Sequence, residues 1–120
     1  MKYSLLKSAI LKATVTEADL RYIGSITIDE DLVERANLKA HENALVVDHT
    51  NGSRLETYVI VGKRGSGIIC MNGASAHLIK EGDEVTIMAF TWTDGVIVPQ
   101  RILVDKENKF VKFLEGVEEV

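Results

Sequence analysis

The feature that most constrains the fold is a succession of short segments rich in Val, Ile and Thr, bounded by Gly, Asn or Asp. Such segments are typical of β-strands, because branched side chains fit a pleated sheet and the bounding residues favour turns. The predicted strands are residues 5–16, 24–28, 44–48, 54–61, 68–71, 83–91, 96–104 and 109–114. The sequence therefore predicts a mainly β protein.

Helices are few. Residues 29–36 begin with acidic residues and then space apolar residues at helical intervals, so we predict a short helix capped by Asp29. A second helical turn is expected within residues 72–79. Asn51-Gly52 lies between two strand-like runs and predicts a tight hairpin, because both residues readily take positive φ angles. Many strands and few helices favour a small closed barrel, since closure removes exposed strand edges.

Size and composition exclude several classes of protein. A chain of 120 residues that is 46% hydrophobic can fill one core, so we expect a single domain over residues 1–120. The net charge of −4 argues against a nucleic-acid partner. Lysines interrupt the apolar residues near the N-terminus, which predicts no signal peptide, no membrane partner and a cytoplasmic location.

The reactive residue types are sparse. Cys70 is the only cysteine, which excludes an internal disulfide, and its apolar neighbours predict a buried, inert thiol. His41, His49 and His77 show no spacing that would place two imidazoles on one ion. We therefore expect no metal site.

One peptide bond, between Gly24 and Ser25, could give this chain its own catalytic group. If the Ser25 hydroxyl attacks the Gly24 carbonyl, an N-to-O acyl shift gives an ester. Elimination then leaves dehydroalanine, and hydrolysis with loss of ammonia leaves a pyruvoyl group. We expect glycine at position 24 to supply a strained turn and an unhindered carbonyl. The dipeptide alone is a weak signal, because Gly-Ser recurs at Gly52-Ser53 and Gly65-Ser66.

The residues around that bond strengthen the case. Four motifs occur in order: Tyr22-x-Gly24-Ser25-x-x-Ile28-Asp29, Asn51-Gly52-x-Arg54-x-x-Thr57-Tyr58, Asn72-Gly73-Ala74-x-Ala76 and Gly82-Asp83. Together they resemble the aspartate 1-decarboxylase family, pyruvoyl enzymes that form β-alanine for pantothenate and coenzyme A. The resemblance covers about residues 5–90.

The resemblance implies a fold, an activity and an assembly. The fold would be a six-stranded double-psi β-barrel with short helices, self-cleaved into residues 1–24 and 25–120. The activity would be decarboxylation of L-aspartate without pyridoxal phosphate or a metal. The protein would form a homotetramer with active sites at subunit interfaces. Both spontaneous cleavage and cleavage assisted by a maturation helper protein are compatible with these residues.

It also implies residue roles. Ser25 would become the pyruvoyl group that forms a Schiff base with the substrate amine, and Tyr58 would return a proton to the substrate. Self-cleavage would use Gly24, Ser25 and Thr57. Arg54 would grip the substrate carboxylate with its planar guanidinium. The substrate-binding residues would be Arg54, Thr57, Asn72, Gly73, Ala74 and Tyr22. Taken singly, each of these has an ordinary structural explanation in a strand, a turn or the core.

The resemblance breaks near the N-terminus. Members of the family commonly carry Ser-Lys-Ile-His-Arg-Ala, where this chain has Ala9 and Leu11 in place of the lysine and the histidine. Lys7 could replace the missing cation if it shares a strand face with Ala9. Two alternatives therefore stay open: a pyruvoyl decarboxylase of another amino acid, and an unprocessed, non-catalytic oligomeric barrel.

Overall fold

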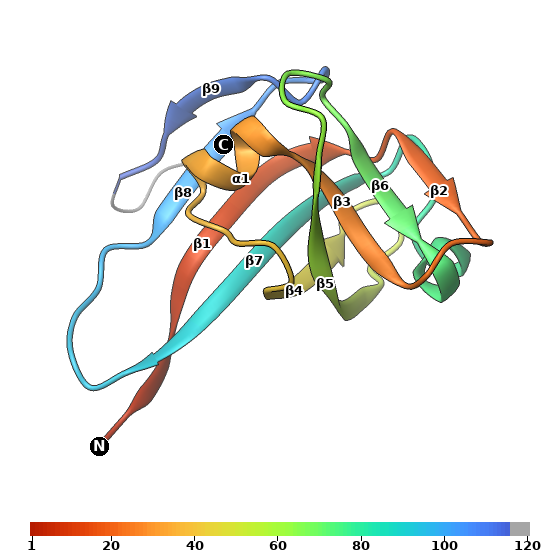
Figure 1. The fold of residues 1–120 in the computed structure, drawn as a ribbon. Coiled ribbons are helices and arrows are strands. Elements are labelled where there is room, and N and C mark those ends of the chain that lie inside the picture. The colour runs from red at the N-terminus through yellow and green to blue at the C-terminus, as the bar shows by residue number, and fades with distance from the viewer. Residues whose placement is uncertain (116–120) are drawn as a thin grey trace.

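A computed structural model describes residues 1–115 of the chain. These residues form one nine-stranded sheet, with one α-helix and one 3-10 helix (Figure 1). The elements are β1 (Tyr3–Thr14), β2 (Glu17–Asp19), β3 (Ser25–Asp29), α1 (Glu30–Arg35), β4 (Asn43–Asp48), β5 (Arg54–Gly62), β6 (Ile69–Asn72), η1 (Gly73–His77), β7 (Glu84–Thr93), β8 (Gln100–Val104) and β9 (Phe110–Phe113). Our predicted domain of 1–120 extends into residues 116–120, which lie outside the described residues.

The sheet closes on itself. Its strand order is β2-β6-β3-β5-β4-β7-β1-β8-β9, and only Val15 and Thr16 separate β1 from β2. The Thr16 backbone N–H donates to the Ile69 carbonyl (2.8 Å), and the Ile69 N–H donates to Thr16 Oγ1 (3.0 Å). β1 and β2 thus act as one interrupted strand that joins both ends of a ring containing β6, β3, β5, β4 and β7.

This ring accounts for the difference between the expected and observed numbers of strands. β1 with β2 counts as one member, which gives the six-stranded barrel that the resemblance implied, while β8 and β9 add to its outside. β2 pairs with β6 and β3 pairs with β5 in parallel, and the other neighbours in the ring are antiparallel. The prediction of a mainly β barrel with short helices is confirmed.

The interior of the ring is filled by alternate strand residues. Ile26 and Ile28 of β3, Val59 of β5, and Ile69 and Met71 of β6 are fully buried in one apolar core. Because side chains alternate across a strand, the intervening residues of β3 and β6 face away from that core. This second face carries the side chain of Ser25.

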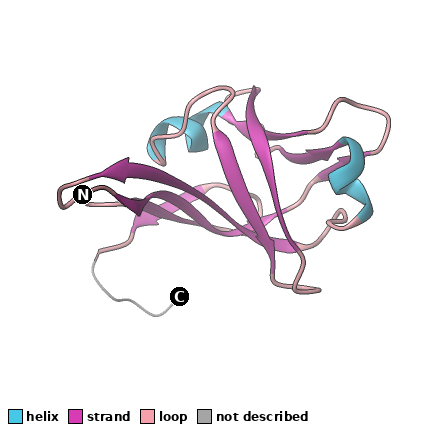
Figure 2. Cartoon of the chain, turned by 90° about the horizontal axis from the view of Figure 1, so that it is seen from below, coloured by secondary structure: helices cyan, strands magenta, loops and turns pink. Residues whose placement is uncertain are grey.

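The predicted helices are present. The side chain of Asp29 caps α1 by accepting a hydrogen bond from the Asp31 N–H (2.9 Å), and Leu32 and Val33 are buried. The second predicted turn is the 3-10 helix η1, not an α-helix. Both helices lie at the rim of the barrel in the view of Figure 2. Neither helix in the described part of the chain is long and apolar enough to cross a membrane.

Two predicted segments differ from the structure. The hairpin between β4 and β5 has a longer connection than a tight two-residue turn, and Gly52 but not Asn51 has a positive φ. The reason is that Asp48 Oδ1 accepts from the N–H groups of Thr50 and Asn51 and opens the turn. β8 begins at Gln100 instead of residue 96, because only Gln100 and later residues pair with β1.

β1 is irregular where the sequence predicted a plain strand. Its register with β7 shifts between Leu6 and Ser8 and again between Ile10 and Ala13, and Lys12 has a φ of 63°. Such bulges redirect the side chains around them. Beyond the ring, β1 and β7 continue as a long ribbon toward the N-terminus (Figure 1). Tyr3, Phe90 and Trp92 on this ribbon are exposed.

Candidate active site

The Gly24–Ser25 bond lies at the wall of a cavity of about 330 Å³. Four of the predicted site residues, Gly24, Thr57, Asn72 and Ala74, line this cavity. The structure therefore brings together residues from the start of β3, the middle of β5 and the junction of β6 with η1. Glu56 and Ser75 also line it, and sequence reasoning assigned them no role.

Ser25 is held on both sides of its hydroxyl. The residue is fully buried, and its Oγ donates to the Ile23 carbonyl oxygen (3.2 Å). The same oxygen accepts a hydrogen bond from Asn72 Nδ2 (2.9 Å). Antiparallel pairing of β3 with β6 sets Ser25 directly opposite Asn72. The hydroxyl that would attack the preceding carbonyl is thus fixed in place by the neighbouring strand.

Asn72 is the centre of this arrangement. Its Nδ2 also donates to Thr27 Oγ1 (3.0 Å), and its Oδ1 accepts from Cys70 Sγ (3.1 Å). Thr27 and Cys70 are themselves opposite one another in the register of β3 and β6. Nothing in the sequence connects Thr27 or Cys70 with Ser25, because these contacts exist only once β3 and β6 pair.

The backbone conformation and close approach that require a glycine are found at Gly73, not at Gly24. Gly24 is not among the glycines with positive φ, and a β-carbon added to it would meet only the Asn72 carbonyl oxygen, at 4.0 Å. Gly73 has a φ of 71°, and a β-carbon there would lie 2.8 Å from both Gly24 Cα and Gly24 N. The positive φ and the close backbone approach thus occur at Gly73, whereas the space beside the Gly24 Cα is open.

Thr57 and Tyr58 point to opposite faces of β5, as the sequence predicted for a regular strand. Thr57 pairs with Ala44, which is fully buried in the core, so Thr57 lies on the core face. Tyr58 precedes Val59 just as Ser25 precedes Ile26, and Val59 and Ile26 are parallel partners. Tyr58 therefore shares the outer face of the sheet with Ser25. Its ring stacks on His41, with 6.2 Å between the ring centroids.

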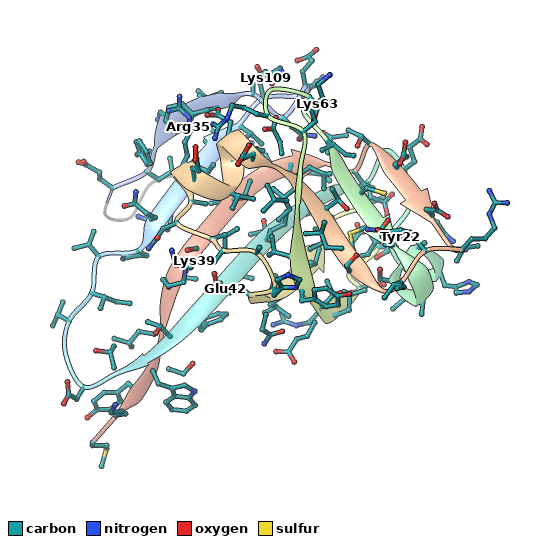
Figure 3. All side chains as sticks on the ribbon, in the orientation of Figure 1. Tyr22, Arg35, Lys39, Glu42, Lys63 and Lys109 are labelled. Atoms are coloured by element: carbon teal, nitrogen blue, oxygen red, sulfur yellow. The ribbon has the colours of Figure 1, made fainter. Side chains whose placement is uncertain are left out.

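Two predicted substrate-binding side chains do not line the cavity. Arg54 is exposed at the start of β5, and its guanidinium forms no hydrogen bond or ion pair with any residue in 1–115. Tyr22 is also exposed, beside the start of β3 (Figure 3). The backbone carbonyl oxygen of Tyr22, not its side chain, lies next to Gly73: it would be 3.0 Å from a β-carbon added to Gly73.

Comparison of the sequence with known proteins places the chain in a family. A family model described as aspartate decarboxylase matches residues 1–111. The chain belongs to the aspartate decarboxylase family.

Individual relatives agree over most of the chain. A protein of Porphyromonas gingivalis named aspartate 1-decarboxylase is 56% identical over 92 residues, which cover 77% of this chain and 78% of the relative. A protein of the same name from Acetivibrio thermocellus is 50% identical, covering 92% of this chain and 91% of its own length. That of Pelotomaculum thermopropionicum is 48% identical, covering 97% and 91%. The resemblance stated from the motifs is confirmed.

Lys7 does not replace the lysine that the aspartate decarboxylase family commonly carries where this chain has Ala9. The bulge at Lys7 breaks the strand alternation that would place it beside Ala9. The Lys7 ammonium lies 3.2 Å from Glu42 Oε2 and also donates to the Asn37 carbonyl oxygen. These groups line a different cavity, between β1 and the loop that carries Lys39 and Glu42 (Figure 3). The expectation that Lys7 supplies the missing cation is not supported.

Cys70 confirms the prediction of a buried, inert thiol. Burial, together with the nearby Glu17 carboxylate, raises the pKa of the Cys70 thiol to about 11. The group is therefore protonated at neutral pH and acts as a hydrogen-bond donor. Within residues 1–115, no three His, Cys, Asp or Glu side chains are grouped so that they could hold a metal ion.

Proposed function

We propose that this chain cleaves itself between Gly24 and Ser25 and then converts L-aspartate to β-alanine and carbon dioxide as a pyruvoyl enzyme. One observation carries the proposal: in a member of the aspartate decarboxylase family, a fully buried Ser25 adjoins an unhindered Gly24 at a cavity wall. The relatives' name, aspartate 1-decarboxylase, supports the substrate. The β-alanine would serve pantothenate synthesis in the cytoplasm.

Self-cleavage would begin when Ser25 Oγ attacks the Gly24 carbonyl carbon. The Asn72 N–H, already 2.9 Å from that oxygen, would stabilise its developing negative charge. Thr57, which lines the same cavity as Gly24, would hydrogen-bond the oxyanion on the Gly24 carbonyl. As the C–N bond breaks, the hydroxyl proton of Ser25 passes to the departing nitrogen, which gives an ester and a free amine at residue 25. Loss of the Ser25 α-proton then breaks the Cβ–Oγ bond, releases Gly24 as a carboxylate and leaves dehydroalanine. Water finally displaces ammonia and leaves the ketone.

The residues around Ser25 fit such a group. A β-carbon on Gly24 would have no neighbour closer than 4.0 Å, so the start of β3 borders open space in the cavity. When present, a pyruvoyl carbonyl supplies an electrophile for the substrate amine and an electron sink for loss of carbon dioxide.

The other roles fall to side chains of this chain. Arg54 would hold the substrate's side-chain carboxylate, because its guanidinium forms no ion pair within residues 1–115. Once Ser25 has lost its hydroxyl oxygen, the Asn72 N–H that it accepts before cleavage would be free. That group and the backbone N–H groups of Gly73 and Ala74 would orient the second carboxylate at the start of η1. Tyr58, on the outer face of the sheet with Ser25, would return the proton to the substrate carbon.

A second copy of the chain would complete the site. Arg54 and Tyr22 are exposed and lie outside the cavity lining, so a site that uses them requires closure over this surface. Exposed apolar side chains on the β1–β7 ribbon, including Tyr3, Phe90 and Trp92, favour association with another protein surface. These observations support the homotetramer with interfacial sites.

One observation favours a second candidate, a pyruvoyl decarboxylase of another amino acid. Position 9 holds a buried Ala9, and among the described residues the cavity next to Ser25 is lined by Glu56 but by no Lys or Arg. A pocket with fewer cations discriminates less strongly for a dianion. Release of carbon dioxide from aspartate, glutamate and neutral amino acids would separate the two candidates: a clear preference for aspartate excludes the second.

Denaturing mass spectrometry of the purified chain tests the proposal. We expect two products, residues 1–24 and residues 25–120, the second carrying a ketone that reacts with a carbonyl-trapping reagent. Ser25→Ala should stay uncut and inactive. Ser53→Ala is the matched control, because Ser53 also follows a glycine and should leave cleavage unchanged. A wild-type chain that remains whole, with no ketone, would instead indicate the non-catalytic barrel.

A further inference from the structure

Four polar side chains form a cluster on the outer face of the sheet, between β3 and β6. Ser25 and Thr27 come from β3, and Cys70 and Asn72 come from β6. They are two cross-strand pairs, Ser25 opposite Asn72 and Thr27 opposite Cys70, so all four project from the same face. We call these four residues the β3–β6 polar cluster.

The amide of Asn72 is fully hydrogen-bonded within this cluster. Its nitrogen donates to two hydroxyl oxygens, Ser25 Oγ at 2.9 Å and Thr27 Oγ1 at 3.0 Å. Its oxygen accepts from Cys70 Sγ at 3.1 Å. The residue is 3% exposed, so water cannot readily replace a lost partner. The amide nitrogen thus has two acceptors, and the amide oxygen has one donor.

The orientation of this amide controls the Ser25 hydroxyl. Because Asn72 donates to Ser25 Oγ, the hydroxyl hydrogen of Ser25 is directed to the Ile23 carbonyl (3.2 Å). In the opposite orientation the amide oxygen would face Ser25 and would accept that hydrogen. The attacking oxygen would then lose the N–H donor that stabilises it as negative charge develops.

Cys70 distinguishes between the two orientations, and Thr27 completes the hydrogen bonding of the favoured one. A buried thiol whose pKa is raised to about 11 keeps its single hydrogen at neutral pH. Of the acceptors around Cys70 Sγ, the Asn72 amide oxygen is the nearest, at 3.1 Å against 3.5 Å for Glu17 Oε2. If the amide were reversed, its nitrogen would face sulfur, which is a weak acceptor. Thr27 adds a second hydroxyl acceptor on the nitrogen side. Cys70 thus selects the orientation in which Asn72 donates to Ser25, and Thr27, whose hydroxyl can donate or accept, takes the second amide hydrogen in that orientation.

We propose that Cys70 and Thr27 are positioning residues for self-cleavage: they fix the Asn72 amide so that it donates to the Ser25 hydroxyl. This inference rests on the proposed self-cleavage at Gly24–Ser25. It gives the buried thiol a role in maturation, although the thiol itself does not react.

The test is the rate at which the full chain is cut, followed over time by denaturing mass spectrometry. Cys70→Ala, which lacks a donor, should be cleaved about five- to tenfold more slowly than wild type, the effect of losing one neutral hydrogen bond. Cys70→Ser restores a donor and should be cleaved within about twofold of wild type. Thr27→Val should slow cleavage similarly, and Thr27→Ser should restore it.

The two positions should also be coupled. Because both act on one amide, the combined Cys70→Ala and Thr27→Val chain should be slowed by less than the product of the single effects. A merely structural role predicts no such rescue by serine and no coupling. Thermal unfolding of each variant in the Ser25→Ala background reports folding separately. If Cys70→Ala fails to fold, the Thr27→Val and Thr27→Ser pair tests the same amide.

The outcomes separate the inference from the proposal beneath it. If wild type is cut and Cys70→Ala is cut equally fast, or if Cys70→Ser is as slow as Cys70→Ala, the positioning role is overturned while self-cleavage stands. If wild type is never cut, the proposed function fails, and the inference fails with it.

Discussion

The backbone of Gly73 lies against the backbone of Gly24: a β-carbon on Gly73 would come within 2.8 Å of Gly24 Cα and N. Gly73 also has a φ of 71°, which a residue with a β-carbon adopts at a cost. The residue that starts η1 thus allows the end of β6 to approach the bond proposed for cleavage.

We predict that Gly73→Ala is destabilised by about 2–5 kcal/mol, from the positive φ and the backbone clash together. It should also cleave more slowly, because Gly24 must move away. Gly52→Ala is the control, since Gly52 has a φ of 79° but no atom within 4 Å of an added β-carbon. Urea unfolding in the Ser25→Ala background measures the stability. Equal losses of stability in Gly73→Ala and Gly52→Ala would contradict the close contact between Gly73 and Gly24.

Arg54 is the predicted anchor for the substrate carboxylate. Arg54→Ala should raise the KM for aspartate roughly ten- to a hundredfold, the range expected for one charged hydrogen bond. Cleavage at Gly24–Ser25 should continue at the wild-type rate. Release of carbon dioxide at varied aspartate concentrations gives the KM, and Arg21→Ala, another exposed arginine, serves as control. An unchanged KM in Arg54→Ala would remove Arg54 from the site.

Asn108 ties the turn between β8 and β9 to the barrel. Buried with a φ of 59°, it accepts from the Thr14 N–H and donates to the carbonyl oxygens of Thr14 and Gly67, each at 2.8 Å. Asn37 has a similar φ of 58° but is exposed and forms no side-chain hydrogen bond within residues 1–115.

Asn108→Ala should therefore cost about 2–4 kcal/mol more than Asn37→Ala, because it leaves buried backbone groups unpaired. Chemical unfolding in the Ser25→Ala background compares the two variants. A loss for Asn108→Ala no larger than that for Asn37→Ala would show that these hydrogen bonds add no net stability.

Asp29 predicts a loss of stability in acid. Burial acts to raise the pKa of its carboxyl, but the N–H groups of Gly67, Gly65 and Asp31 and the charge of Lys109 together lower it below 3.8. The native state then binds fewer protons than the unfolded chain near that pH. The stabilisation is present above about 3.8 and is lost as the pH falls through the lowered pKa.

Asp29→Asn should therefore be less stable than wild type at neutral pH, with a gap that narrows in acid. Unfolding free energies measured from neutral pH to below 3.8 in the Ser25→Ala background test this. The exposed Asp94→Asn should show no such trend. If the difference in unfolding free energy between wild type and Asp29→Asn does not change with pH, the lowered pKa of Asp29 is contradicted.

Asp48 predicts the opposite dependence. Burial and the neighbouring Asp83 carboxyl raise the pKa of Asp48 above 3.8. Wild type therefore loses stability as the pH rises from 3.8 through the raised pKa. Asp48→Asn keeps an oxygen to accept from the N–H groups of Thr50 and Asn51 and removes the repulsion.

Relative to wild type, Asp48→Asn should gain stability as the pH rises toward neutrality. Asp83→Asn should gain with the same sign, since either change removes one of two adjacent charges. The measurement is the free energy of unfolding across this pH range. A loss of stability in both variants at neutral pH would refute the close pairing of these carboxyl groups.

Much of the fold could be predicted from local pattern. Short segments rich in branched residues and bounded by Gly, Asn or Asp located β3 to β7, and the acidic start of residues 29–36 located α1 with its Asp29 cap. The short β2 was missed. What divides it from β1 is a pair of tertiary hydrogen bonds, from the Val15 and Thr16 N–H groups to the carbonyl oxygens of Asp83 and Ile69. The bulges of β1 were also missed, because a bulge exists only relative to a partner strand: two residues of β1 lie opposite one residue of β7.

For the candidate site, the sequence by itself determined the residue types and their order. It identified the Gly24–Ser25 bond, and its motifs identified the family that the comparisons confirm. Only the tertiary structure decided which residues meet. In the structure the close backbone approach that requires glycine is at Gly73, and Lys7 forms an ion pair with Glu42. Asn72 forms the hydrogen bonds that link Ser25 with Thr27 and Cys70. The physical reason is that hydrogen bonds and close contacts between strands depend on register and on the face each side chain occupies, and these follow from pairing between segments distant in the chain.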